Sequence, residues 1–250
     1  MPDRASDASG RDQSASDEAT SGPKQHFPET QITWIQERLG EGEAGQSQIK
    51  EHVMRLYYRP LQYYFLGLRG LRNLGEPEDI VGGYFADRLS RNDFFDKWRA
   101  SGIKLRRWLM NGLHFYLKER IRAENRARSS GGDPETLQLA VDEEELDPDE
   151  GFDREFAHAL VAEALKQVHT GCMESGLKDH WEIFIRHHYH GELYKDFASE
   201  YDIQPVRASV MSRTVRDRFR AAIRQLLLED GVKPSDLETE IQTLMESMAE

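Results

Sequence analysis

A basic segment between Gly191 and Leu228 carries the residue types that bind DNA. Six arginines and one aspartate lie between residues 204 and 224. A helix that enters a major groove needs an apolar back to hold it and a cationic front for phosphates and base edges. Small or apolar residues stand where such a motif faces inward: Phe197, Ala198, Tyr201, Ile203, Ala208 and Met211. The pattern predicts a helix-turn-helix, and the alternative is a surface helix with a solvated charged face.

The outward side of the second helix supplies the candidate contacts to DNA. Gln204, Ser209 and Arg213 are assigned to bases, and Arg216 and Arg220 to phosphates. The candidate set is completed by Arg207 and Ser212. An alternative register of this helix would turn Val206 and Val210 inward.

A second cationic segment mixes its charges with aromatic rings. Ten lysines and arginines lie between residues 97 and 128, against two glutamates. This mixture suits single-stranded DNA, because cations hold phosphates while rings stack on bases. Trp108 is assigned to the core. The candidate contacts to a melted strand are Lys104, Arg106, Arg107, Asn111, His114 and Lys118.

The overall charge of −12 hides these two cationic segments, because the residues between them are strongly acidic. Phosphate affinity depends on the local density of lysine and arginine, so the total does not exclude nucleic acid. No apolar run approaches the roughly 18 residues of a membrane span, and the first residues do not resemble a signal peptide. The single cysteine, Cys172, excludes an internal disulfide. These features predict a cytoplasmic protein.

Enzyme motifs are absent from the sequence, so no catalytic residue and no cofactor are expected. His187 and His190 lie three residues apart, within reach of one ion on a helix. The neighbouring residues offer no obvious third ligand, so no metal site is expected.

Apolar periodicity predicts an all-α fold of two small helical domains joined by a flexible acidic linker. The predicted parts are a disordered tail (1–26), a first helical domain (27–126), the linker (127–151), a helix-turn-helix domain (152–230) and an amphipathic C-terminal helix (231–250). The acidic C-terminal helix is expected either to mask the arginines between Arg207 and Arg224 or to extend the hydrophobic core.

The ordered set of motifs resembles the bacterial extracytoplasmic-function sigma factors, in a planctomycete-like subgroup. The resemblance covers roughly residues 27–230. It is carried by FPETQITWI, LYYRPLQYYF, EPEDIVGGYFADRL, KLRRWLMNGLHFYLKERIRAENRAR and the helix-turn-helix. The sequence departs from the usual pattern at Gly82 and Gly83, where the close approach of another backbone is expected.

The resemblance implies a factor that binds core RNA polymerase, recognises the minus-35 and minus-10 promoter elements and promotes melting. It implies contacts to the largest catalytic subunits and the flap, with Glu78, Asp79, Tyr84 and Arg88 as exposed contacts beside an apolar strip. An anti-sigma factor or another regulator is a further candidate partner. Two alternatives from other classes are a stand-alone helix-turn-helix transcription regulator and an adaptor whose acidic segments mimic DNA.

Overall fold

The computed structural model describes residues 37–38, 40–129 and 148–249, and every regular element in these ranges is a helix. The predicted all-α class is thus confirmed. The first half contains α2 (Glu43–Gly67), the 3-10 helix η1 (Arg69–Leu74), α3 (Pro77–Leu89), α4 (Phe94–Ser101) and α5 (Leu105–Ser129). The second half contains α6 (Pro148–Glu174), α7 (Lys178–His188), α8 (Tyr194–Phe197), η2 (Ala198–Tyr201), α9 (Pro205–Glu229), η3 (Pro234–Asp236) and α10 (Leu237–Ala249). Among the described helices, none combines the length and the apolar composition needed to cross a bilayer.

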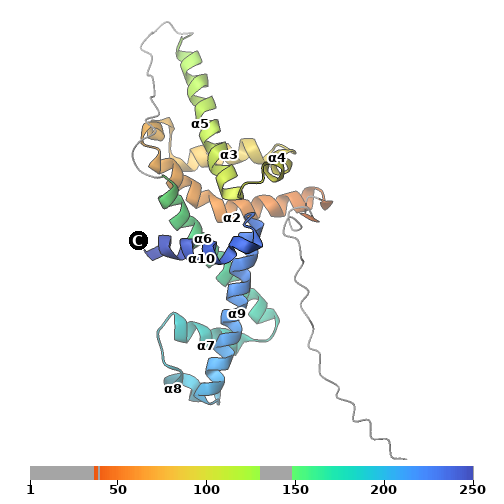
Figure 1. The fold of residues 1–250 in the computed structure, drawn as a ribbon, viewed down its shortest axis with the longest axis vertical. Coiled ribbons are helices and arrows are strands. Elements are labelled where there is room, and N and C mark those ends of the chain that lie inside the picture. The colour runs from red at the N-terminus through yellow and green to blue at the C-terminus, as the bar shows by residue number, and fades with distance from the viewer. Residues whose placement is uncertain (1–36, 39, 130–147, 250) are drawn as a thin grey trace, which may run out of the picture.

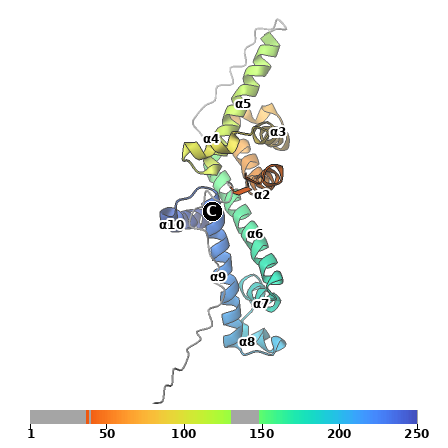
Figure 2. The same cartoon turned by 90° about the vertical axis from the view of Figure 1, so that its right-hand side faces the viewer.

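The molecule is elongated, with the end of α5 and the α8 turn at opposite ends of its long axis (Figure 1, Figure 2). The long helices α6 and α9 contact each other and run along this axis. α2 packs against α3, α5 and α6. Its buried residues include one at every fourth position, as an amphipathic helix requires: Ile49, Val53, Tyr57, Leu61 and Phe65.

α3 begins at Pro77, where the sequence predicts a helix start. Glu76 before it is extended, and Glu78 and Asp79 follow in the first turn. Proline fits this position because its missing N–H has no partner there, and acids interact favourably with the positive end of the helix dipole. The large apolar residues of α3 are all buried, namely Ile80, Val81, Tyr84, Phe85 and Leu89. The expected apolar strip beside the two acids is therefore part of the core and not of the surface.

Glycines allow α3 and α5 to pack closely through two tyrosines. The Tyr84 hydroxyl donates to the Leu109 carbonyl at 3.0 Å. A Cβ on Gly112 would clash with the oxygen of this Tyr84 hydroxyl. On the other side, a Cβ on Gly83 would lie 2.6 Å from the Tyr116 hydroxyl. The close approach expected at Gly83 is thus made, but by a tyrosine side chain and not by another backbone.

The segment predicted as an acidic linker is helical at both of its ends. α5 continues to Ser129, and α6 starts at Pro148 with Asp149 and Glu150 in its first turn. Phe152, at the predicted start of the second domain, is fully buried. The middle of the predicted linker, residues 130–147, lies outside the described residues, as do the predicted N-terminal tail and the start of the first domain.

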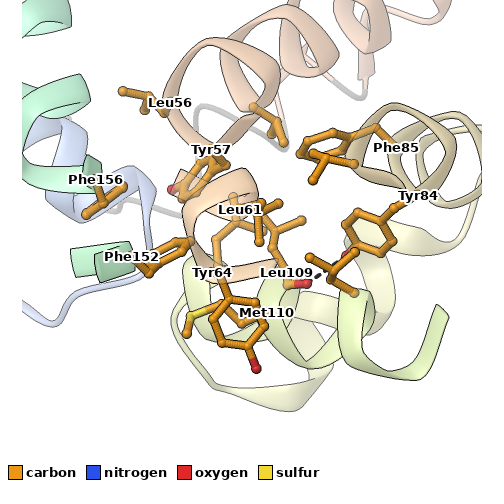
Figure 3. Close-up of a cluster of buried hydrophobic side chains, with 14 of the residues drawn as sticks. Leu56, Tyr57, Leu61, Tyr64, Tyr84, Phe85, Leu109, Met110, Phe152 and Phe156 are labelled. Atoms are coloured by element: carbon orange, nitrogen blue, oxygen red, sulfur yellow. Dashed lines mark hydrogen bonds between the residues drawn. The ribbon is translucent and has the colours of Figure 1, made fainter. Parts of the chain in front are cut away.

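The core of the first half continues into the second half. Phe152 and Phe156 from α6 face Tyr64 and Tyr57 from α2 (Figure 3). The rings of Tyr57 and Phe156 stack with centroids 5.4 Å apart. The same core includes residues from the end of α9 and beyond: Ile223, Leu226, Leu227, Val232 and Leu244. One hydrophobic core therefore joins the first half to α6, α9 and α10.

The amphipathic helix predicted near the C-terminus is present as α10, and it contacts α6 and α9. Leu244 is buried in the shared core. Glu238 forms an ion pair with Arg224 at 2.5 Å, close to the end of α9 that lies away from the helix-turn-helix. α10 therefore extends the core, and the alternative placement over the first half of α9 is not adopted.

Candidate nucleic-acid interface

The helix-turn-helix lies at one end of the molecule and is built from α8, η2 and the first half of α9 (Figure 1). Asp202 adopts the left-handed conformation, with φ of 53°, and turns the chain between η2 and α9. Gln204 is extended and Pro205 occupies the first turn, so α9 starts as a proline-led helix should. The first helix of the motif is only a short α-helical segment followed by a 3-10 turn.

The apolar residues assigned to the inside of the motif form a small core of their own. Phe197, Ala198, Ala208 and Met211 are buried together with Ile183 from α7. Tyr201 and Ile203 are partly buried against them. The core fixes the rotation of α9 about its axis and so decides which residues face solvent.

The outward face of α9 contains most of the residues assigned to DNA. Gln204, Arg207, Arg213 and Arg220 are exposed, while Ser209 and Arg216 are partly buried. Ser212 is only 1% exposed, so its assignment to DNA is wrong. It lies one position from Met211 and four from Ala208, on the side that packs against the domain.

Two apolar residues share this outward face. Val206 is 76% exposed and Val210 is 48% exposed, so the register that would turn them inward is not adopted. The sequence assignment of base contacts did not include them. The signal that could have found them is their spacing of four, which places them on one side of the helix beside Arg213.

Arg186, near the end of α7, stabilises the entry to the helix-turn-helix. Its guanidinium donates to Glu192 at 3.0 Å and to Glu200 at 2.6 Å and lies 4.4 Å from the Phe197 ring centroid. These hydrogen bonds lower the pKa of both carboxyls. Glu192 and Glu200 are thus both compensated by a cation. Sequence reading missed this residue, because Arg186 and Glu200 are 14 positions apart.

The histidines near α7 take part in packing. The His187 ring stacks on Tyr194 with centroids 4.0 Å apart, and its Nδ1 lies 2.8 Å from the Glu192 carbonyl oxygen. Within the described ranges, no cluster of three or more metal-ligating side chains occurs.

A second candidate interface follows the exposed side of α5, which projects beyond α3 and α4 (Figure 1). Arg107, Asn111, Phe115, Arg122 and Arg126 are exposed at spacings of four and seven, so they form one stripe along the helix. Phe115 is 63% exposed. The predicted contacts His114 and Lys118 are partly buried beside this stripe. We call the five exposed residues, without His114 and Lys118, the α5 stripe.

Lys104 and Arg106, also assigned to a melted strand, lie instead in a charge cluster where α5, α9 and α10 meet. Arg106 is 5% exposed and forms ion pairs with Glu240 and with Asp230, whose Oδ2 lies 3.4 Å from Nη1. Lys104 is partly exposed and also pairs with Glu240. Asp230 accepts hydrogen bonds from the Tyr57 hydroxyl at 2.8 Å and the Arg106 N–H at 3.0 Å. The assignment of Arg106 to DNA is therefore corrected, because its guanidinium neutralises buried carboxylates.

The residues assigned to polymerase contact separate in the same way. Glu78 and Asp79 are exposed at the start of α3. Arg88 is partly buried and pairs with Glu119 at 2.8 Å. Tyr84 is 0% exposed, so its assignment as an exposed contact is wrong. Burial raises the pKa of its hydroxyl, which keeps it protonated as a donor.

The chain therefore presents two cationic faces, the start of α9 and the α5 stripe, and one exposed acidic pair on α3. In comparisons with protein-family models, curated proteins and solved structures, no match to this chain is found.

Proposed function

We propose that the protein is a transcription initiation factor of the sigma type, which binds double-stranded promoter DNA through α9 and a melted strand through the α5 stripe. The observation that carries this proposal is the pair of separate, chemically different cationic faces in one chain. A factor that both recognises and melts a promoter has to contact duplex and single-stranded DNA together.

The face of α9 suits a duplex. Its arginines flank a narrow row of short side chains, which allows the helix to enter a major groove. The Arg213 side chain is 72% exposed, and its ion pair with Asp217 has a separation of 3.9 Å. A surface pair of this length contributes little, so the guanidinium can exchange it for a base edge or a phosphate.

The α5 stripe suits a single strand. The Phe115 ring is 63% exposed, so it does not take part in the hydrophobic core. Rings of this kind stack on bases, while neighbouring arginines hold the backbone. Phe115 lies between Asn111 and Arg122 on the stripe, so a base stacked on it would have polar and cationic neighbours along the helix.

Binding of labelled DNA to variants of the full chain tests the two faces separately. Arg213→Ala is expected to weaken duplex binding by about 1–3 kcal/mol and to leave single-strand binding unchanged. Phe115→Ala is expected to weaken single-strand binding by about 1–3 kcal/mol per stacked base and to spare the duplex. Equal losses on both probes for both variants would contradict the two-face assignment.

The polymerase role needs a second test. Purified bacterial core RNA polymerase should co-elute with the wild-type chain, and Asp79→Lys should abolish co-elution while circular dichroism remains unchanged. Asp236→Lys, which changes the charge equally at an exposed position of η3, is the matched control and should still co-elute. Normal co-elution of a folded Asp79→Lys variant would remove this support.

A second candidate is a stand-alone helix-turn-helix regulator, which binds duplex DNA without polymerase. The shared core favours it, because Phe152 and Phe156 join the two halves into one unit. The co-elution experiment distinguishes the two candidates: specific duplex binding without any affinity for core polymerase would select the stand-alone regulator.

A further inference from the structure

Val206 and Val210 are apolar side chains on a helix face that otherwise consists of polar and cationic residues. They lie in the first two turns of α9 and are 76% and 48% exposed. The neighbouring apolar residues Ala208, Met211 and Val215 are buried on the opposite side. The valines are therefore not needed to hold the motif together. Isolated exposed apolar residues are ordinary, but these two are aligned and lie at the centre of the candidate DNA-reading face.

The hydroxyl groups on the same part of the helix are already engaged by the backbone. Ser209 Oγ donates to the Val206 carbonyl at 2.8 Å, and Thr214 Oγ1 donates to the Val210 carbonyl at 3.2 Å. Their protons are therefore not available to a base. The middle of the reading face presents methyl groups at residues 206 and 210 and then the guanidinium of Arg213.

The thymine methyl group is the apolar feature that distinguishes base edges in the major groove, and it is read by contact with apolar side chains. A donor such as the Arg213 guanidinium instead selects the O6 and N7 acceptors of guanine. Four residues of α-helix rise about 6 Å, which corresponds to roughly two base pairs at about 3.4 Å each. The two valines can therefore contact methyl groups on the same or on neighbouring steps.

We infer that α9 reads its duplex through thymine methyl groups contacted by Val206 and Val210, next to a guanine contacted by Arg213. This inference deepens the proposed duplex binding and rests on it. The predicted target is a short T-rich step that adjoins a G·C pair. The valines would supply specificity through contact area, while the arginines outside this row supply affinity for phosphates.

The test begins with duplexes selected from a random pool by the full-length protein. In one selected duplex, each thymine is replaced singly by deoxyuridine, which keeps every hydrogen-bonding group and removes only the methyl. At one or two positions the affinity of the wild-type chain should fall about fourfold, as expected for one buried methyl group. The remaining positions should show no change.

Variants assign the effect to the valines. Val206→Ala should bind the thymine duplex more weakly and lose its sensitivity to deoxyuridine at one position, and Val210→Ala should do so at that position or the next. Arg220→Ala, the matched control, should bind all duplexes more weakly and keep the full deoxyuridine effect. If the wild-type chain binds a selected duplex but no deoxyuridine changes its affinity, or if both valine variants keep the effect, the inference is overturned. If no duplex is bound, the proposed function itself fails.

Discussion

Replacement of Arg106 by alanine should destabilise the fold without acting through DNA. The Arg106 guanidinium lies among the carboxylates of Asp230 and Glu240, and its Nε is 4.0 Å from the Asp153 carboxylate. The Asp230 side chain is 0% exposed and that of Glu240 is 11% exposed. Removing the cation leaves two buried carboxylates without their main countercharge. Loss of one partner of a buried ion pair costs about 3–5 kcal/mol of folding stability.

The expected loss lies near the lower end of this range, because part of the cluster remains. Lys104, whose side chain is 35% exposed, still pairs with Glu240, and the Tyr57 hydroxyl still donates to Asp230. We therefore expect a loss of about 3 kcal/mol. Arg107 is the matched control, because it is the next residue on the same helix and pairs with Asp149 at the surface. Arg107→Ala should change stability by less than about 1 kcal/mol.

Urea unfolding followed by circular dichroism measures both variants. At neutral pH the loss for Arg106→Ala should be largest, and it should shrink as the pH falls. The sign follows from burial, which raises the pKa of Asp230: without Arg106 the folded protein binds a proton more readily than the unfolded chain, so acid relieves the unpaired charge. A loss below 1 kcal/mol, or one equal to that of Arg107→Ala, would refute the assignment of Arg106 to a buried cluster.

Two further predictions concern other buried groups. Burial, together with the nearby Glu163 carboxylate, raises the pKa of the Glu229 carboxyl from 4.5 to about 7. His52 Nε2 lies 3.5 Å from this carboxyl. Because the pKa is raised in the folded state, folding stability is lost as the pH rises from about 5 to 7. Glu229→Gln should therefore be more stable than the wild type at pH 8, by roughly 2–3 kcal/mol, and this advantage should vanish near pH 5 in thermal unfolding; an advantage independent of pH would contradict it. Gly112→Ala should destabilise by about 1–3 kcal/mol, because its Cβ would meet the Tyr84 hydroxyl. Gly82→Ala is the matched control, because the nearest atom to its Cβ would be 3.7 Å away. It should raise the free energy of unfolding by up to about 1 kcal/mol in urea unfolding. Equal effects of the two variants would argue against the tyrosine–glycine packing.

Local patterns in the sequence predicted the all-α class and the helices well, since each helix depends on residues close together in the chain. The start of α3 followed from Pro77 and the acids after it, and the inward side of the motif followed from the spacing around Ala198 and Ala208. The start of α6 carried the same signal at Pro148, with acids in the first turn. It was missed because the acidic composition of the segment was interpreted as that of a linker.

The errors at the candidate sites have a different physical origin. Arg106, Tyr84 and Ser212 are all of residue types that bind DNA or protein, and Arg106 and Ser212 are each followed by an exposed arginine. Arg106 and Tyr84 are buried against partners more than 20 residues away in the chain. These partners are Glu240 for Arg106 and Leu109 for Tyr84. Local composition contains no information on such pairings. An exposed arginine and a buried one, as at Arg107 and Arg106, look the same until the tertiary fold is known.

The charge cluster also determines how the two candidate DNA faces are related in space. The start of α9 and the far end of α5 lie toward opposite ends of the molecule (Figure 1). The helices between them share one core. Arg106 joins the start of α5 to Asp230, directly after α9, and to α10. The charge cluster around Arg106 therefore holds the two faces at a fixed separation. Two linked binding sites increase the overall affinity only when the linkage allows both to be occupied at once. In a factor that contacts duplex and melted DNA at once, the burial of Arg106 would contribute to promoter recognition through geometry, without a contact to DNA.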